Sequence, residues 1–189
     1  NFASLLAGYP SSEGGTSKSI TGLTPGATYQ YRLRAVTGGG ETGNSNTISV
    51  LLLPDVPVAT AATSITQTGF TANWNAATGA TDYFVDVATV NPPTSSFVTG
   101  FNNVAVNGTS IAVTGLSTGI IYYYRVRANN ASGISGNSNV ITQGTVPPTP
   151  TSNAVLIAQA DFFIATWNEV PNVDGYELDV CPKGDNFVN

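Results

Sequence analysis

The feature that most constrains this chain is an internal repeat with a period of 93 residues. Shifted by one period, residues 20–48 align without a gap with residues 113–141, and 15 of these 29 positions are identical. The correspondence continues further along the chain, where Trp74 falls on Trp167. Because the copies share so much sequence, we expect them to share one fold. The 189-residue chain is long enough for about two such repeats.

The apolar residues within one period follow the pattern of β-strands. Residues 70–74 alternate apolar and polar side chains, which is the two-residue period of a half-buried strand. In a second strand, Tyr83, Val85 and Val87 share one face. A third strand alternates in the same way. Its inward face is formed by Tyr122, Tyr124, Val126 and Ala128. Its outward face is formed by Tyr123, Arg125 and Arg127.

Turn-forming residues separate these strands at intervals of about ten residues, a spacing typical of all-β domains. Such turns are expected at residues 24–26, 77–79 and 107–108, which combine Gly with Pro, Thr or Asn, and at the three consecutive glycines 38–40. Short strands with this spacing, and no stretch of helical periodicity, predict a β-sandwich.

The composition excludes several classes of function. A net charge of −5 with only six basic residues argues against a nucleic-acid partner. With no His and a single Cys, the chain lacks the commonest general base and any thiolate metal cluster. No nucleophile elbow or phosphate-binding loop occurs either. We therefore predict no enzyme activity, no catalytic residue, no cofactor and no bound metal, and no apolar run long enough to span a membrane.

A few residues at fixed spacing resemble the fibronectin type III family. That family has a Trp on an early strand and a Leu six residues before a Tyr whose hydroxyl bonds back to the backbone, the tyrosine corner. The matching residues here are Trp74 and Trp167, Leu23 and Tyr29, and Leu116 and Tyr122. The Tyr-Arg-Leu/Val-Arg-Ala segment and the Asn-Ser-Asn after it are similar to repeats of secreted and surface proteins of bacteria. The resemblance implies an all-β chain of tandem immunoglobulin-like β-sandwiches.

The repeats are out of phase with the chain. Residues 1–53 correspond to the C-terminal half of a fibronectin type III repeat, 54–144 to a complete repeat, and 145–189 to the N-terminal half of another. Proline-rich joints at 54–57 and 147–150 separate them. Two explanations stay open: the chain is a window excised from a longer array, or the half-repeats of identical chains complete each other head to tail.

The outward face of the tyrosine-corner strand carries most of the positive charge. In a fibronectin-type sandwich this strand neighbours the one with Asp86, so we expect Asp86 to pair with Arg125 or Arg127. As an exposed pair this would contribute about 0–1 kcal/mol. The alternative is a patch for an anionic ligand that also uses the equivalent Arg32 and Arg34.

Two aromatic residues, Phe84 and Tyr123, are also predicted to face outward, where they could lie close together. Exposed aromatic rings can stack on a sugar or contact a protein partner, and they can equally cover a neighbouring loop or domain. Asp174, Glu177 and Asp179 are a conceivable calcium site, but their spacing favours a solvated strand face.

The function that these features favour is structural. We expect a non-catalytic spacer array on a bacterial cell surface, in a filament or otherwise outside the cell, with neighbouring repeats of the same or an identical chain as partners. One alternative is an adhesion module that binds a glycan or a surface protein through Phe84 and Tyr123. A second alternative is a set of accessory domains of a secreted hydrolase. In each case the expected location is extracellular or the cell surface.

Overall fold

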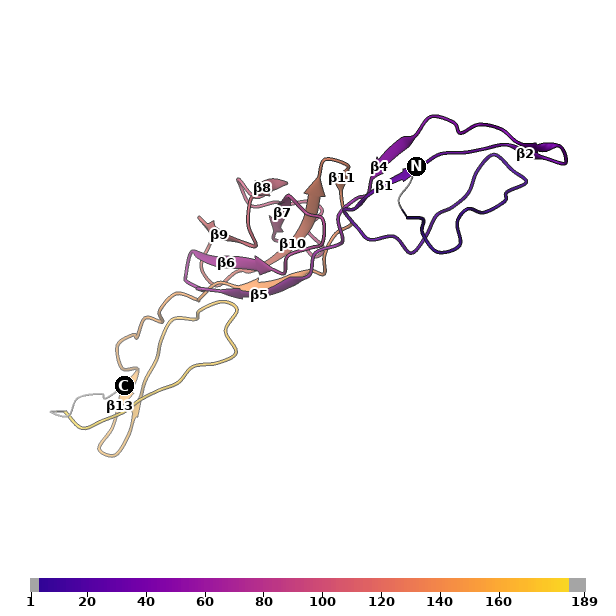
Figure 1. Cartoon of the computed structure of the whole chain (residues 1–189). Helices are drawn as coiled ribbons and strands as arrows, with labels where there is room; N and C mark the ends of the chain where they lie inside the picture. Colours follow the sequence, from indigo (N-terminus) through magenta and orange to yellow (C-terminus); the bar gives the residue numbers. More distant parts are fainter. Residues whose placement is uncertain (1–3, 184–189) are drawn as a thin grey trace.

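The computed structural model of the chain describes residues 4–183. Every regular element in this range is a β-strand, and no helix occurs within it. A central sandwich lies between two open pieces, residues 4–53 beyond one end and residues 145–183 beyond the other (Figure 1). Since this range has no helix, it also contains no helix able to cross a membrane. The predicted all-β, immunoglobulin-like fold is confirmed for the central sandwich.

The central sandwich consists of two antiparallel sheets. The first sheet has the strand order β5-β6-β9 and contains β5 (Ala59–Thr63), β6 (Gly69–Trp74) and β9 (Ser110–Thr114). The second has the order β11-β10-β7-β8, with β12 also paired to β10. Its strands are β7 (Asp82–Ala88), β8 (Val104–Val106), β10 (Ile121–Asn130), β11 (Gly133–Ile134) and β12 (Ile141–Gly144).

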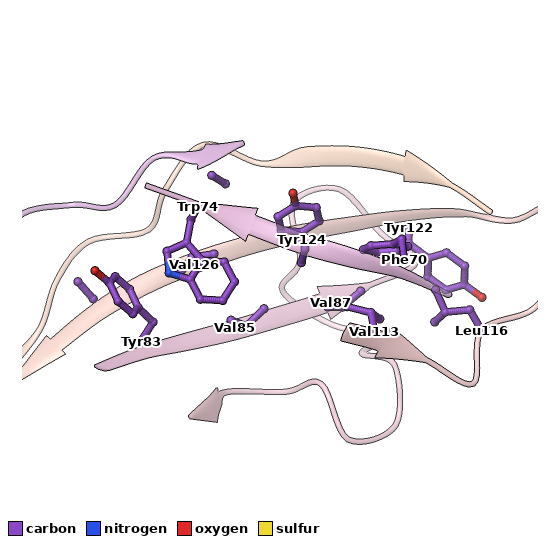
Figure 2. Close-up of a cluster of buried hydrophobic side chains, with 13 residues drawn as sticks. Phe70, Trp74, Tyr83, Val85, Val87, Val113, Leu116, Tyr122, Tyr124 and Val126 are labelled. Atoms are coloured by element: carbon purple, nitrogen blue, oxygen red, sulfur yellow. The ribbon is translucent and has the colours of Figure 1, made fainter. Parts of the chain in front are cut away.

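The alternating apolar residues of both sheets form one core. Trp74 and Tyr122 lie in the same buried cluster, as expected for a single two-layer module (Figure 2). The Tyr122 hydroxyl accepts a hydrogen bond from the backbone N–H of Ser117 at 2.9 Å, which is the tyrosine corner. Trp74 packs against Tyr83 with ring centroids 5.6 Å apart. The core therefore combines residues from the N-terminal half of the central sandwich, such as Trp74, with residues from its C-terminal half, such as Tyr122.

Hydrogen bonds also connect the two halves of the module across the sandwich. The Asn139 side chain binds both the N–H and the carbonyl of Ala59, at 2.9 Å each. The Tyr124 hydroxyl donates to the carbonyl of Thr60. Burial raises the pKa of the Tyr124 phenol, because the ionised form would lose its hydration.

Residues 4–53 form two small ladders without a covering sheet. The strands are β1 (Thr28–Tyr31) paired with β4 (Ile48–Leu51), and β2 (Val36–Thr37) paired with β3 (Gly40–Glu41). Both registers are the same as those that β10 makes with β12 and β11 one period later. The hydroxyl of Tyr29 accepts a hydrogen bond from the Thr24 N–H at 3.0 Å, as Tyr122 does from Ser117.

Residues 145–183 form a hairpin and an isolated bridge. The elements are β13 (Ile157–Ala158) paired with β14 (Phe163–Ile164), and the bridge between Ser152 and Trp167. Trp167 packs on Tyr176 with ring centroids 5.4 Å apart, close to the Trp74–Tyr83 arrangement. The division of the ends into half-repeats stays a prediction, although their local geometry follows that of the central sandwich.

A close backbone contact joins the first piece to the central sandwich. Gly26 lies in the turn before β1, and a Cβ added to it would lie 2.2 Å from the Cα of Gly79. The Asn130 side chain fastens the same joint by donating to the carbonyls of Leu52 at 2.9 Å and Gly79 at 3.2 Å. One period later Gly119 meets Asn172, whose side chain donates to the Gly119 carbonyl at 2.6 Å.

Candidate functional site

The sequence places its candidate functional side chains on the outward face of β7 and β10, called the β7/β10 face below. The two strands are antiparallel, and the pairs Phe84–Arg127, Asp86–Arg125 and Ala88–Tyr123 stand opposite each other on this face. Their alternate neighbours, such as Val85 and Val126, point into the core. The face is thus set by the same alternation that builds the core.

At the centre of the β7/β10 face lies a carboxylate between two guanidinium groups. The Nε of Arg125 donates to Oδ2 of Asp86 at 3.0 Å. The Nη2 of Arg127 lies 3.1 Å from the same oxygen and 3.3 Å from Oδ1. The backbone N–H of Asn103 donates to Oδ1 at 2.8 Å. The predicted pairing is confirmed, with both arginines rather than one of them.

The expectation that this pair is exposed is wrong. Asp86 is only 1% exposed, because the two long arginine side chains and the loop that carries Asn103 cover its carboxylate. A buried charge requires this degree of hydrogen bonding, and breaking such a pair costs far more than breaking an exposed one. Since the Asp86 carboxylate binds both guanidinium groups, the arginines of the central sandwich belong to an internal ion cluster, which we favour over an anion-binding patch.

Phe84 and Tyr123 both lie on the β7/β10 face and are half-buried. They are not adjacent, because Phe84 stands opposite Arg127 whereas Tyr123 stands opposite Ala88, with the Asp86–Arg125 pair between them. Two separated rings can contact an extended ligand only at two points. Their role as a glycan or protein contact stays a prediction.

The other candidate residues do not form a site in the described part of the chain. Asp174, Glu177 and Asp179 are all exposed, and between residues 4 and 183 no group of three or more acidic, His or Cys side chains is placed to hold a metal ion. An open apolar groove of about 500 Å³ lies on residues 145–183 instead. Its lining includes Phe163, Trp167, Leu178 and Val180. All four side chains are exposed, although Trp167 is the repeat counterpart of the core residue Trp74.

One repeated interaction was missed by the sequence analysis. The Tyr83 hydroxyl accepts a hydrogen bond from the Ala77 N–H at 2.9 Å, and the Tyr176 hydroxyl accepts one from the Val170 N–H at 2.6 Å. Each Tyr therefore ties its strand to the turn six residues before it. The signal that could have revealed this is the conservation of the Tyr between the two periods of the chain itself.

Similar proteins were found by sequence and by structure. Residues 55–144 match the model of the fibronectin type III domain family. The chain is 29% identical over 149 residues to chitinase A1 of Niallia circulans and 26% identical over 165 residues to endoglucanase B of Cellulomonas fimi. These alignments cover 71% and 79% of the chain but only 20% and 15% of the two relatives. Among solved structures, the 6th fibronectin type III domain of human fibronectin type III domain containing protein 3 is 25% identical. The match covers 60% of this chain and 98% of that domain, with a TM-score of 0.42.

Proposed function

Because residues 55–144 form one fibronectin type III domain, we propose that the chain is a non-catalytic spacer in an extracellular protein. Its task is to hold other parts of that protein at a set distance. The observation that carries the proposal is the joint at Gly26 and Gly79, where backbone meets backbone and leaves no room for a side chain. A joint that is packed in this way, and held by the Asn130 side chain, fixes the direction of residues 4–53 relative to the sandwich.

The β7/β10 face supports the same proposal. Its charged groups are used internally, because the Asp86 carboxylate already accepts hydrogen bonds from Arg125, Arg127 and the Asn103 backbone. A catalytic or anion-binding site would need at least one of these groups to turn toward a ligand, and that would remove a hydrogen bond from the buried Asp86 carboxylate.

The spacer proposal is tested at the joint. Replacing Gly26 by alanine is expected to force the joint open, because its Cβ would lie 2.2 Å from the Cα of Gly79. Small-angle X-ray scattering should show a changed maximum dimension, and proteolysis at residues 52–55 should become several-fold faster. The control is Gly119→Ala. Gly119 has a similar φ of 65° against 68° for Gly26, but its added Cβ would meet nothing closer than 3.4 Å. Equal effects of both substitutions would show that backbone strain, not the close contact, is responsible.

A second candidate function is that of an accessory module in a secreted hydrolase. It is favoured by the similarity to a chitinase and an endoglucanase, which the chain matches over a small part of their length. In such a protein the spacer would separate a catalytic domain from other domains. The two candidates differ in what lies beside these residues in the full protein, and they agree that this segment performs no chemistry.

The adhesion alternative predicts binding through Phe84 and Tyr123. For a spacer, we expect the purified chain and the double variant Phe84→Ala/Tyr123→Ala to sediment equally little with insoluble chitin or cellulose. The comparison is informative because both rings are half-buried and their removal leaves the core residues in place. If the unmodified chain is retained and the double variant is not, the β7/β10 face is a binding surface and the spacer proposal is incomplete.

A further inference from the structure

Residues 4–53 and residues 145–183 each expose an apolar face to solvent. The two faces correspond to the two complementary halves of the core in the central sandwich. The groove on residues 145–183 is lined by Phe163, Trp167 and Val180. Their counterparts one period earlier, Phe70, Trp74 and Val87, are core residues of the central sandwich. Phe163 is 50% exposed, whereas Phe70 is 3% exposed. The groove is therefore the first half of a sandwich core without its second half.

Residues 4–53 present the missing second half. In the central sandwich the residues that cover Phe70 and Trp74 come from β9 and β10, and include Val113, Tyr124 and Val126. Their counterparts in the first piece are Ile20, Tyr31 and Leu33, all of them exposed. Leu33 is 67% exposed, whereas Val126 is fully buried at 0%. Each piece thus holds the side chains that the other piece needs.

The strands that each piece contains, and those that it lacks, follow the same division. The end pieces form those ladders for which both strands lie in the same piece. These ladders are β1 with β4, β2 with β3, and β13 with β14. In the central sandwich, the β7–β10 and β6–β9 ladders join the two halves. The counterparts of β7 and β9, residues 175–181 and 17–21, form no strand, because the strands they would pair with are in the other piece.

We propose that residues 145–183 of one chain bind residues 4–53 of a second copy, and that together they form a composite fibronectin-like sandwich. The two pieces lie beyond opposite ends of the central sandwich (Figure 1), so the binding surfaces of one copy point to two different neighbours. Such an interface is heterologous, and it produces head-to-tail chains of molecules. The proposal goes beyond the spacer function and does not depend on it, since a monomeric chain could still act as a spacer.

The contacts of the composite sandwich can be named from the central one. The Asn46 side chain would bind the backbone of Ser152, as Asn139 binds that of Ala59. The Tyr31 hydroxyl would donate to the carbonyl of Asn153, as the Tyr124 hydroxyl does to that of Thr60. Both are contacts between chains, so they would form only on association.

Charge complementarity supports the same pairing. Asp179 is the counterpart of Asp86, and Arg32 and Arg34 are the counterparts of the two arginines that bind it. In the separate pieces Asp179 is exposed, and Arg34 pairs with Glu41 at 2.7 Å where both side chains are about half exposed. In the composite, Arg32 and Arg34 of one copy would stand opposite Asp179 of the other. One donor would be missing, because Pro10 stands where the N–H of Asn103 contacts Asp86.

The first test is the mass of the 189-residue chain as a function of its concentration, by analytical ultracentrifugation. We expect a progressive increase above the 19.4 kDa of one chain, as open head-to-tail association requires. The variants Phe163→Asp and Leu33→Asp, which place a charge in one face each, should both weaken self-association by at least about tenfold, since each truncates the apolar centre of the interface. A chain that stays monomeric at all concentrations overturns the proposal.

Mixing the two variants tests the direction of assembly. Phe163→Asp retains the intact face of residues 4–53, and Leu33→Asp retains the intact groove. At concentrations where the unmodified chain associates but this weakening keeps each variant alone monomeric, we expect the mixture to form a heterodimer of twice the 19.4 kDa chain mass and nothing larger. If the mixture stays monomeric, or if either variant still polymerises, the two faces do not bind each other and the proposal fails.

The matched control is Leu156→Asp. Leu156 is more exposed than Phe163 and lies in the same piece, but its counterpart Thr63 is exposed in the central sandwich. This substitution should leave the association unchanged, because the composite does not cover Leu156. If it dissociates the chain as strongly as Phe163→Asp, the association is unspecific adhesion between apolar patches.

A charge exchange tests the register. Asp179→Arg should weaken association several-fold, and a partner that carries Arg32→Asp and Arg34→Asp should restore it. Restoration in this combination alone shows that the strand with Asp179 lies beside the strand with Arg32. If the exchanged pair binds no better than either changed chain binds the unmodified one, this register is wrong.

Discussion

Replacing Trp74 by alanine is expected to lower the free energy of unfolding of the central sandwich by about 3–5 kcal/mol. Trp74 is 3% exposed and packs against Tyr83 in the core that joins both sheets (Figure 2). Truncation would remove a large apolar area from the core and leave a cavity that the strands cannot close. Urea unfolding followed by far-UV circular dichroism measures the change.

The chain supplies its own control for this substitution. Trp167 is the counterpart of Trp74 and packs on Tyr176 in the same way, but it is 37% exposed and has no second sheet above it. At dilutions where the chain is monomeric, Trp167→Ala is expected to cost at most about 1 kcal/mol. Trp74→Phe retains an aromatic ring in the core and should cost less than Trp74→Ala, because the cavity it leaves is smaller. Neither substitution breaks a hydrogen bond, since the Trp74 Nε1–H has no partner. Equal costs at Trp74 and Trp167 would contradict the burial difference.

Replacing Asp86 by asparagine is expected to cost about 3–5 kcal/mol, the range found when one partner of a buried ion pair is removed. The substitution keeps the shape of the side chain but leaves Arg125 and Arg127 without their counter-charge. Their side chains are 15% and 23% exposed, so water can compensate only in part. The same urea unfolding experiment measures the loss.

Two further variants separate charge from packing at this position. Asp179→Asn changes the exposed counterpart and should alter the stability of the dilute chain by no more than about 0.5 kcal/mol. Replacing Arg125 and Arg127 by methionine in the Asp86→Asn background should recover part of the lost stability, because no unpaired charge would remain. If Asp86→Asn alone costs less than about 1 kcal/mol, the cluster behaves as a surface pair, as its sequence position suggested.

The main features of the central sandwich could be predicted from the sequence because its strands alternate cleanly. The inward positions of β6, β7 and β10 are those that the two-residue period gave, and Trp74 and Tyr122 lie in one core. The pairing of Asp86 with the arginines could also be predicted, since residues on the same face of neighbouring strands meet across the sheet. Periodicity carries this information because it depends only on the local strand geometry.

Burial of Asp86 could not be predicted from periodicity. The alternation assigns Asp86 to the outward face, and that assignment is correct. What removes the carboxylate from water is the loop that brings Asn103 over it, together with the length of two arginine side chains. A loop has no repeating pattern that indicates where its backbone N–H groups point. The separation of Phe84 from Tyr123 was equally hidden, because it depends on the register between two strands and not on the sequence of either one.

The joint between segments has a geometric consequence for any longer assembly. The turn glycine Gly26 meets the turn of Gly79, and Gly119 meets the turn of Asn172 in the same place one period on. In a head-to-tail assembly of identical chains, one and the same step relates each copy to the next, and the repetition of that step is a screw rotation. An assembly built through this step would be a helix with constant pitch, and Tyr123 would recur along it as a spiral of evenly spaced points.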